Sequence, residues 1–180
     1  MSKYTPTFVF SSIYDIDFSK LYAQGKKIII SDLDNTLLPY YETKATNNLI
    51  EWKKRLNETG LKLYIITNNN EDRILKLQET FNIDGYLTKA NKPSPKRLKE
   101  YLKSHNIKLE ETIFLGDQLV TDIACANNLG IQSILVKTID IKHQKWYTKI
   151  NRLREKRIIK KMMKENPKIA RAILEFKENA

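Results

Sequence analysis

The sequence predicts an α/β fold in which helices cover both faces of a parallel β-sheet, the arrangement called doubly wound. Short apolar runs without polar alternation, such as residues 26–32 and 61–67, are typical of strands that are buried on both faces. Segments with the helical period separate these runs, and the connections between them are short. The regular alternation of strands and helices over 180 residues therefore favours one parallel sheet.

The elements are expected in the following order. Residues 8–24 form a lead-in segment that contains a short helix at 17–23. The strands are expected at residues 26–32, 61–67, 86–88, 112–115 and 131–136. The later helices are expected at residues 46–59, 70–81, 94–105, 118–128 and 143–165, and a short last helix begins at Pro167.

Local signals support the helix assignments. Leu49, Trp52 and Leu56 repeat with helical spacing and mark the inner face of the helix at 46–59. Ser94 and Pro95 are the residue types favoured at the N-cap and the first position of a helix.

The composition is that of a folded globular protein, with 41% hydrophobic residues, five Gly and five Pro. The single cysteine, Cys125, excludes an internal disulfide and fits a reducing compartment. Polar residues follow Met1, and no apolar run approaches the ~20 residues of a membrane span. We therefore expect a cytoplasmic protein, with the inner membrane face as the site of any peripheral association.

The net charge of +11 is concentrated in one segment. Residues 1–141 hold 19 Lys and Arg against 17 Asp and Glu, a balance of +2. Residues 142–164 hold ten Lys and Arg against one acid, a balance of +9. Such a block is either a surface for polyanions or a solvated helix face.

Polar residues gather where the predicted strands end. In open parallel sheets, ligands bind at the carboxyl ends of the strands. The residues at these ends are Asp32 and Asp34, Thr67 and Asn68, Lys92, and Asp117 and Asp122. Any one of them alone could cap a helix or form a turn. Their recurrence at four strand ends favours a shared site.

These residue types fit one chemistry. Two adjacent carboxylates at a buried strand end repel each other, and a hard cation such as Mg²⁺ offsets that repulsion. A carboxylate held in this way can attack a phosphoryl group, and a second carboxylate can act as general acid and then base. A hydroxyl, backbone N–H groups and a lysine can hold the phosphoryl oxygens.

The same residues resemble the motifs of the haloacid dehalogenase superfamily of phosphotransferases. DLDNT at 32–36 is similar to the first motif, and Thr67 in IITN to the second. Lys92 in KP is similar to the third motif, and GDQLVTD at 116–122 to the fourth. The resemblance implies the Rossmann-like fold of this superfamily. It also implies phosphatase activity, because an acid at position 34 distinguishes the phosphatases of the superfamily from its dehalogenases.

The resemblance implies a role for each matching residue. Asp32 would be the nucleophile and a Mg²⁺ ligand, and Asp34 would be the general acid and base, with its backbone carbonyl on the metal. Thr67 and the Asn68 backbone would hold the phosphoryl group, and Lys92 would neutralise charge on the nucleophile and the phosphate. Asp117 would bind the metal directly. Asp122 would either bind the metal through a water molecule or orient Lys92.

A narrower resemblance is to the YqeG-type branch, subclass IIIA, which is related to mitochondrial phosphatidylglycerophosphatase. It is carried by SSIYDIDFSKL before the first strand, by GDQLVTDI, and by TKINR at 148–152. It implies a phosphorylated substrate with a phospholipid head group, phosphatidylglycerophosphate. The long lysine-rich tail departs from the branch, so a soluble or nucleic-acid phosphate stays open as the substrate.

The spacing of the motifs leaves no room for a cap domain. Thirty-two residues separate Asp34 from Thr67, and 24 separate Thr67 from Lys92, enough in each case for one helix and one strand. An open site suits a phosphate displayed on a membrane or macromolecule. We expect a phosphatase domain at residues 1–141 and a basic helical extension at 142–180.

Three interpretations of the basic segment 142–164 stay open. It could bind an anionic membrane, with each cation contributing ~1 kcal/mol and Trp146 and Tyr147 at headgroup depth. It could instead dock on its own domain through Trp146, Ile150 and Leu153, with its lysines solvated. It could also bind RNA as part of a ribosome-associated factor, although few aromatic residues are available for base stacking.

Overall fold

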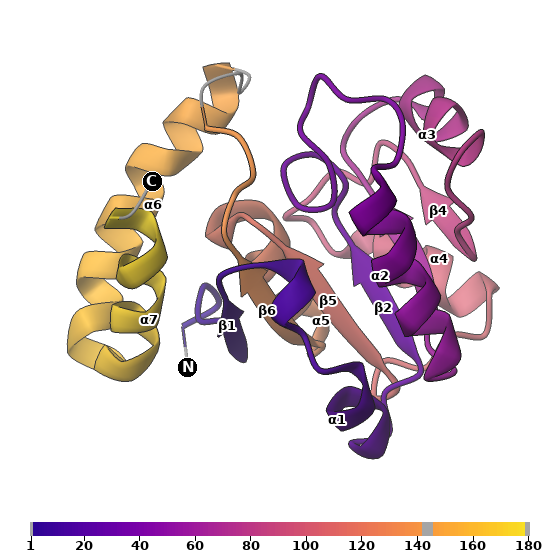
Figure 1. The fold of residues 1–180 in the computed structure, drawn as a ribbon. Coiled ribbons are helices and arrows are strands. Elements are labelled where there is room, and N and C mark those ends of the chain that lie inside the picture. The colour runs from indigo at the N-terminus through magenta and orange to yellow at the C-terminus, as the bar shows by residue number, and fades with distance from the viewer. Residues whose placement is uncertain (1, 142–145, 179–180) are drawn as a thin grey trace.

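The structure is a computed structural model that describes residues 2–141 and 146–178, with side chains for 2–141 and 150–175. Six parallel strands form one sheet in the order β1-β6-β5-β2-β3-β4 (Figure 1). The strands are β1 (Phe8–Phe10), β2 (Ile28–Ser31), β3 (Lys62–Ile66), β4 (Gly85–Leu87), β5 (Thr112–Gly116) and β6 (Gln132–Val136).

The helices alternate with these strands. They are α1 (Phe18–Ala23), α2 (Asn47–Glu58), α3 (Glu71–Gln78), α4 (Lys96–Ser104), α5 (Ala124–Leu129), α6 (Trp146–Glu165) and α7 (Pro167–Glu178). Two shorter turns are a 3-10 turn, η1 (Ile13–Asp15), and a π-helical turn, η2 (Leu119–Ile123).

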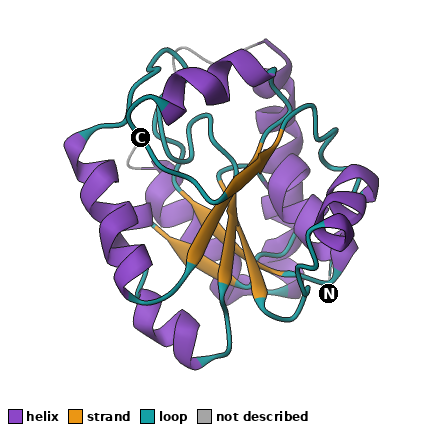
Figure 2. Ribbon diagram, turned by 90° about the vertical axis from the view of Figure 1, so that its right-hand side faces the viewer, coloured by secondary structure: helices purple, strands orange, loops and turns teal. Residues whose placement is uncertain are grey.

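Helices cover both faces of the sheet, as Figure 2 shows. On one face, α1, α2 and α3 bury apolar side chains, including Trp52 and Leu56 of α2, against alternate residues of the strands. On the other face, Leu98 and Leu102 of α4 and Cys125 of α5 pack on the intervening strand residues. The predicted doubly wound α/β fold is therefore confirmed.

The strand order reverses between β2 and β5. The chain passes from β2 outward to β3 and β4, and then returns to the other side of β2 to form β5 and β6. The loops after β2 and β5 therefore leave the sheet in different directions. Such a switch point opens a crevice at the carboxyl ends of the strands, where the predicted site residues lie.

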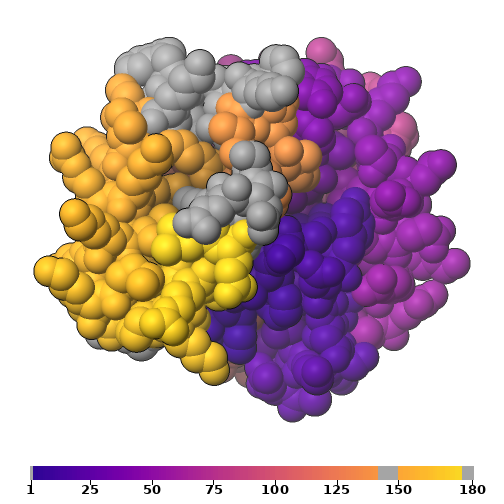
Figure 3. All heavy atoms as spheres, turned by 60° about the vertical axis from the view of Figure 1, so that its left-hand side comes forward, coloured from indigo at the N-terminus to yellow at the C-terminus, as the bar shows by residue number. Residues whose placement is uncertain are grey.

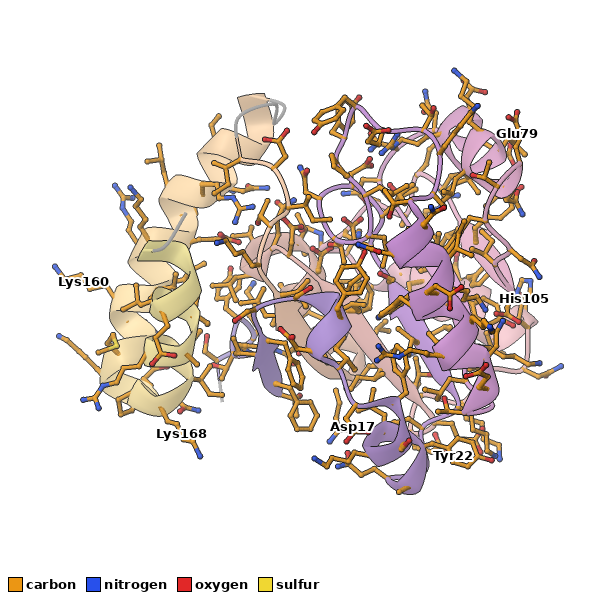
Figure 4. All side chains as sticks on the ribbon, in the orientation of Figure 1. Asp17, Tyr22, Glu79, His105, Lys160 and Lys168 are labelled. Atoms are coloured by element: carbon orange, nitrogen blue, oxygen red, sulfur yellow. The ribbon has the colours of Figure 1, made fainter. Side chains whose placement is uncertain are left out.

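The C-terminal helices pack beside β6 and the edge strand β1 (Figures 1 and 3). Ile159 and Met162 of α6 and Ile173 of α7 are buried in one cluster with Leu135 of β6. On the outer side of these helices, Lys160 extends away from the sheet (Figure 4). Within the part of the chain that the structure describes, no helix combines the length and apolar character needed to cross a membrane.

Two boundary predictions near the sheet were wrong. The lead-in segment contains a strand, β1, which pairs with β6 through registers such as Phe8 with Ile134. Three residues are too few to show the alternation typical of a strand, so the sequence alone did not predict it. The strand is defined by its pairing with β6. The helix predicted to reach Phe81 ends at Gln78, and Phe81 is buried in the core from the following loop.

The predicted N-cap at Ser94 was also wrong. The N-cap position is Pro95, and no side chain caps the helix there. The Ser94 N–H donates to the Asn91 carbonyl in a turn, and the first helical bond from Lys99 ends on the Pro95 carbonyl. The turn therefore delays the start of α4 by one residue.

The interpretation in which Ile150 and Leu153 dock on the domain is contradicted. These side chains are 45% and 65% exposed. Residues further along α6, such as Ile159, make the contact instead. The Trp146 and Tyr147 side chains, and residues 142–145, lie outside the described part of the structure.

Candidate active site

Asp32 lies at the end of β2 and forms an ion pair with Lys92. The Lys92 ammonium donates to Asp32 Oδ1 at 2.7 Å and to Asp122 Oδ1 at 2.8 Å, and all three residues are buried. Burial by itself lowers the pKa of Lys92, but Asp122 and Asp32 outweigh it, so the pKa is raised above its ordinary value. Lys92 is therefore a charged group that links the end of β2 to η2.

Asp122 is held close to the end of β5 by the local backbone. A Cβ atom on Gly116 would lie 2.4 Å from the Cβ of Asp122, so a side chain at position 116 would displace it. The Gln118 N–H donates to Asp122 Oδ2 at 3.1 Å. The π-helical turn begins here, because the Ile123 N–H reaches the Gln118 carbonyl at 3.2 Å.

Asp32, Asp117 and Asp122 bring carboxylate oxygens within 4.8 Å of one another, and all three residues are buried. Burial raises the pKa of Asp32 well above its ordinary value, and Lys92 offsets part of this effect. Burial likewise raises the pKa of Asp117 to about 6, against the lowering effect of Arg152. Asp32 and Asp117 therefore resist ionisation in the absence of a cation, and a buried set of carboxylate oxygens suits Mg²⁺.

Asp34 is not part of that cluster, and its carboxylate has different partners. It accepts hydrogen bonds from Arg73 Nε and from Asn69 Nδ2. Arg73 also donates to the Pro39 carbonyl at 2.9 Å and to the Glu42 carbonyl at 2.6 Å. One guanidinium therefore orients the Asp34 carboxylate and ties the loop after β2 to α3.

The residues after β3 support the lysine loop. The Asn68 side chain accepts from the Lys92 N–H at 2.8 Å and donates to the Lys92 carbonyl at 3.0 Å. This reciprocal pair fixes the backbone from which the lysine extends. The buried Thr67 hydroxyl accepts from the Asn69 N–H at 3.1 Å.

Asp117 is held by one residue from the segment after β6 and one residue from α6. The Thr138 hydroxyl donates to Asp117 Oδ2 at 2.8 Å, and Arg152 Nη2 lies 3.0 Å from the same oxygen. Arg152 Nη1 is 3.2 Å from Glu155 Oε2, and Glu155 Oε1 accepts from the Leu119 N–H at 2.6 Å. The basic helix is therefore bonded both to the acidic cluster and to the turn that carries Asp122.

A cleft of about 350 Å³ brings the sequence-predicted residues together. Six of the seven predicted residues line it; the seventh, Asp117, does not line the cleft but belongs to the acidic cluster with Asp32 and Asp122. The six lining residues are Asp32, Asp34, Thr67, Asn68, Lys92 and Asp122.

Sequence reasoning missed the side chains that hold these residues in place. None of the four motifs contains these side chains, and only one of them, Thr138, comes directly after a strand, two residues beyond β6. The others are Arg73, Arg152 and Glu155. Arg152 is the last residue of the TKINR run, which carries the family resemblance but does not indicate what the arginine contacts. The available signal was that a cation of this run could form an ion pair with a carboxylate of the acidic motif at 116–122.

Known protein families and sequences are similar to this chain. A family model described as haloacid dehalogenase-like hydrolase matches residues 27–136. The chain is 36% identical over 148 residues to "Probable phosphatase YqeG" of Bacillus subtilis (strain 168), covering 82% of this chain and 85% of that protein. It is 34% identical over 95 residues to "Glyceraldehyde 3-phosphate phosphatase" of Pyrococcus abyssi (strain GE5 / Orsay), covering 46% of this chain and 38% of that protein.

Solved structures share the fold. An uncharacterized protein from Listeria monocytogenes serotype 4b aligns with a TM-score of 0.53 and 18% identity, covering 66% of this chain and 85% of that chain. A haloacid dehalogenase family enzyme from Bacteroides thetaiotaomicron, solved with magnesium and inorganic phosphate, aligns with a TM-score of 0.51 and 14% identity, covering 67% and 97%. Because the family model matches more than half of the 180 residues and the Bacillus relative is similar along most of them, the chain belongs to the haloacid dehalogenase-like hydrolases.

Proposed function

We propose that the protein is a Mg²⁺-dependent phosphomonoester hydrolase that works through an aspartyl phosphate on Asp32. The observation that carries this proposal is the convergence of Asp32, Lys92 and Asp122 through contacts of 2.7 and 2.8 Å in a cleft that Asp34 also lines. A nucleophile, a charge-neutralising lysine and a separate acid-base group are the parts that phosphoryl transfer requires.

In the first step, an Asp32 carboxylate oxygen attacks phosphorus, and the bond between phosphorus and the substrate oxygen breaks. Asp34, as the carboxylic acid, donates its proton to that oxygen, so the leaving group departs as an alcohol. Arg73 and Asn69 hold the Asp34 carboxyl in one orientation. Lys92, the Thr67 hydroxyl and the Asn68 N–H carry the shifting charge on the phosphoryl oxygens.

In the second step, water attacks phosphorus of the aspartyl phosphate. Asp34, now a carboxylate, accepts a proton from that water, and the bond between phosphorus and the Asp32 oxygen breaks. The products are inorganic phosphate and the free Asp32 carboxylate. A Mg²⁺ ion held by Asp32, Asp117, Asp122 and the Asp34 carbonyl would supply the positive charge that lets the buried nucleophile approach an anionic phosphate.

The proposed substrate is phosphatidylglycerophosphate at an anionic membrane surface. Support comes from α6, because Arg154 of this basic helix lines the cleft and the neighbouring Ile150 and Leu153 are exposed. Apolar residues among cations are suited to the headgroup region of an anionic bilayer. The short connections after β2 and β3 hold single helices, which supports an uncapped site open to a lipid.

A small soluble phosphate is the second candidate substrate. It is favoured by the similarity to the Pyrococcus protein named for glyceraldehyde 3-phosphate, although that similarity covers 46% of this chain. A soluble substrate would not require the exposed residues of α6.

The test compares phosphate release from phosphatidylglycerophosphate in mixed micelles with release from glyceraldehyde 3-phosphate and an aryl phosphate, all with Mg²⁺. The lipid proposal predicts the highest kcat/KM for the micellar substrate and a decrease when Ile150 and Leu153 are both changed to Ser. Preference for the soluble phosphate, unaffected by this change, would support the second candidate. Absence of release from every substrate would overturn the phosphatase mechanism itself.

A further inference from the structure

The first turns of α6 form one wall of the active-site cleft. Asn151 and Arg154 line the cleft together with Asp32 and Asp34. The wall is anchored, because the Asn151 amide lies 3.4 Å from Gln118 Oε1 and residues further along α6 are buried against the sheet. Arg154 is therefore presented to the cleft by a fixed helix.

Among the side chains that the structure describes, Arg154 differs from the other cations near the site in having no acidic partner. Of the described residues that line the cleft, Lys92 and Arg154 carry positive charge. Lys92 is neutralised by two carboxylates, and Arg152, two residues before Arg154, is bound to Asp117 and Glu155. Within residues 2–141 and 150–175, no hydrogen bond or ion pair involves the exposed Arg154 side chain.

An unpaired guanidinium that lines the cleft can bind an anionic group of a substrate. Its planar array of donors matches the oxygens of a phosphate or carboxylate, often through two parallel hydrogen bonds. Arg154 takes no part in the ion pairs around Asp32, where the reacting phosphate would lie. A group bound by Arg154 would therefore be a second anion of the same substrate.

We propose that Arg154 forms a second anion-binding subsite that selects substrates carrying another negative group, a phosphodiester, phosphate or carboxylate, beside the scissile phosphomonoester. Asn151 contributes its amide to the same subsite. This inference rests on the proposed phosphatase function and deepens it, because it names the substrate class that the cleft prefers. Lipids and soluble compounds can both carry such a group, so the test must separate them.

The experiment measures kcat/KM of the full chain and of Arg154→Ala with three substrates. These are p-nitrophenyl phosphate, which has no second anion, water-soluble glycerophosphoglycerophosphate, and micellar phosphatidylglycerophosphate. We expect Arg154→Ala to lower kcat/KM about 10-fold or more for both diester-bearing substrates and to leave p-nitrophenyl phosphate unchanged. Arg154→Lys should recover part of the loss, and Arg157→Ala, on an exposed part of the same helix, is the matched control.

The outcomes separate the subsite from the phosphatase function. A loss restricted to the micellar substrate would mean that Arg154 contacts the membrane, and an equal loss for all three would place it on the scissile phosphate; either overturns the subsite. No loss also overturns it. If the wild type releases no phosphate from any substrate, the proposed function fails. The subsite can then still be tested by measuring the binding of glycerophosphoglycerol by calorimetry. Binding to the wild type but not to Arg154→Ala would support the subsite, and equal binding to both would refute the subsite.

Discussion

Arg152 Nη2 lies 3.0 Å from Asp117 Oδ2, although 35 positions of sequence separate the two residues. Asp117 belongs to the acidic cluster at the end of β5, and Arg152 belongs to the helix that follows the boundary predicted at residue 141. The same guanidinium reaches Glu155, which in turn accepts from the Leu119 N–H. The basic helix and the site therefore share one buried network.

Replacing Arg152 should weaken metal binding, because this residue and Thr138 hold one oxygen of Asp117 in place. We expect Arg152→Ala to raise the Mg²⁺ concentration for half-maximal activity by about 10-fold, the lower end of the effect of removing a residue that orients a metal ligand. Titration of Mg²⁺ in a phosphate-release assay measures this, with Arg157→Ala as the control. A lower melting temperature with an unchanged Mg²⁺ requirement would mean that Arg152 serves packing alone.

Replacing Arg73 should affect the acid-base step, because Arg73 orients the Asp34 carboxyl. An alkoxide leaving group needs a proton more than a nitrophenolate does. We therefore expect Arg73→Ala to lower kcat about 100-fold for an alkyl phosphate and less for p-nitrophenyl phosphate. Steady-state kinetics on both substrates measure the difference, with Arg55→Ala on the exposed side of α2 as control. An equal decrease for both substrates would show that Arg73 does not act through proton transfer.

The effect of Mg²⁺ on stability should depend on pH. The pKa of Asp117 is raised from 3.8 to about 6 in the folded protein, mainly by burial. The folded state therefore binds more protons than the unfolded state between these values, and this group lowers the free energy of unfolding as pH rises through that range. Above pH 6 the ionised carboxylate is available to a cation, whereas at pH 5 a proton competes for it.

We therefore expect Mg²⁺ to raise the melting temperature at pH 7.5 and to raise it much less at pH 5. At 100 times its dissociation constant a ligand adds about 2.7 kcal/mol, which corresponds to roughly 5–10 °C for a chain of this size. Thermal unfolding with and without Mg²⁺ at the two pH values measures this. An equal Mg²⁺ effect at both would contradict the assignment of Asp117 to the cation.

The sequence located most of the candidate site because β2, β3 and β5, which precede all the predicted residues except Lys92, have a clear apolar signature. β2, for example, is buried at all four positions, and Asp32 follows it directly. Parallel strands bring their carboxyl ends to one edge, so proximity in space could be derived without a structure. The four motif-bearing strand ends do meet at one cleft.

The supporting residues could not be derived in this way. Arg73 meets Asp34 across 39 residues, and no local pattern indicates which of 32 Lys and Arg side chains turns toward an acid. The edge strand β1 is too short to carry a period and exists through its pairing with β6. The charge of 142–164 indicated either a surface for polyanions or a solvated helix face, and neither interpretation revealed that Arg152 bonds to the buried Asp117.

The proposed mechanism requires that Asp32 becomes phosphorylated during turnover. Rapid acid quench of the enzyme with a ³²P-labelled phosphomonoester and Mg²⁺, followed by peptide mapping, measures this most directly. The control is Asp17→Asn, which keeps an acceptor at the exposed N-cap of α1, remote from the cleft (Figure 4). We expect hydroxylamine-sensitive label on the Asp32 peptide in the wild type and in Asp17→Asn, and neither label nor turnover in Asp32→Asn. Turnover by Asp32→Asn at the wild-type rate, or label on another residue, would contradict it.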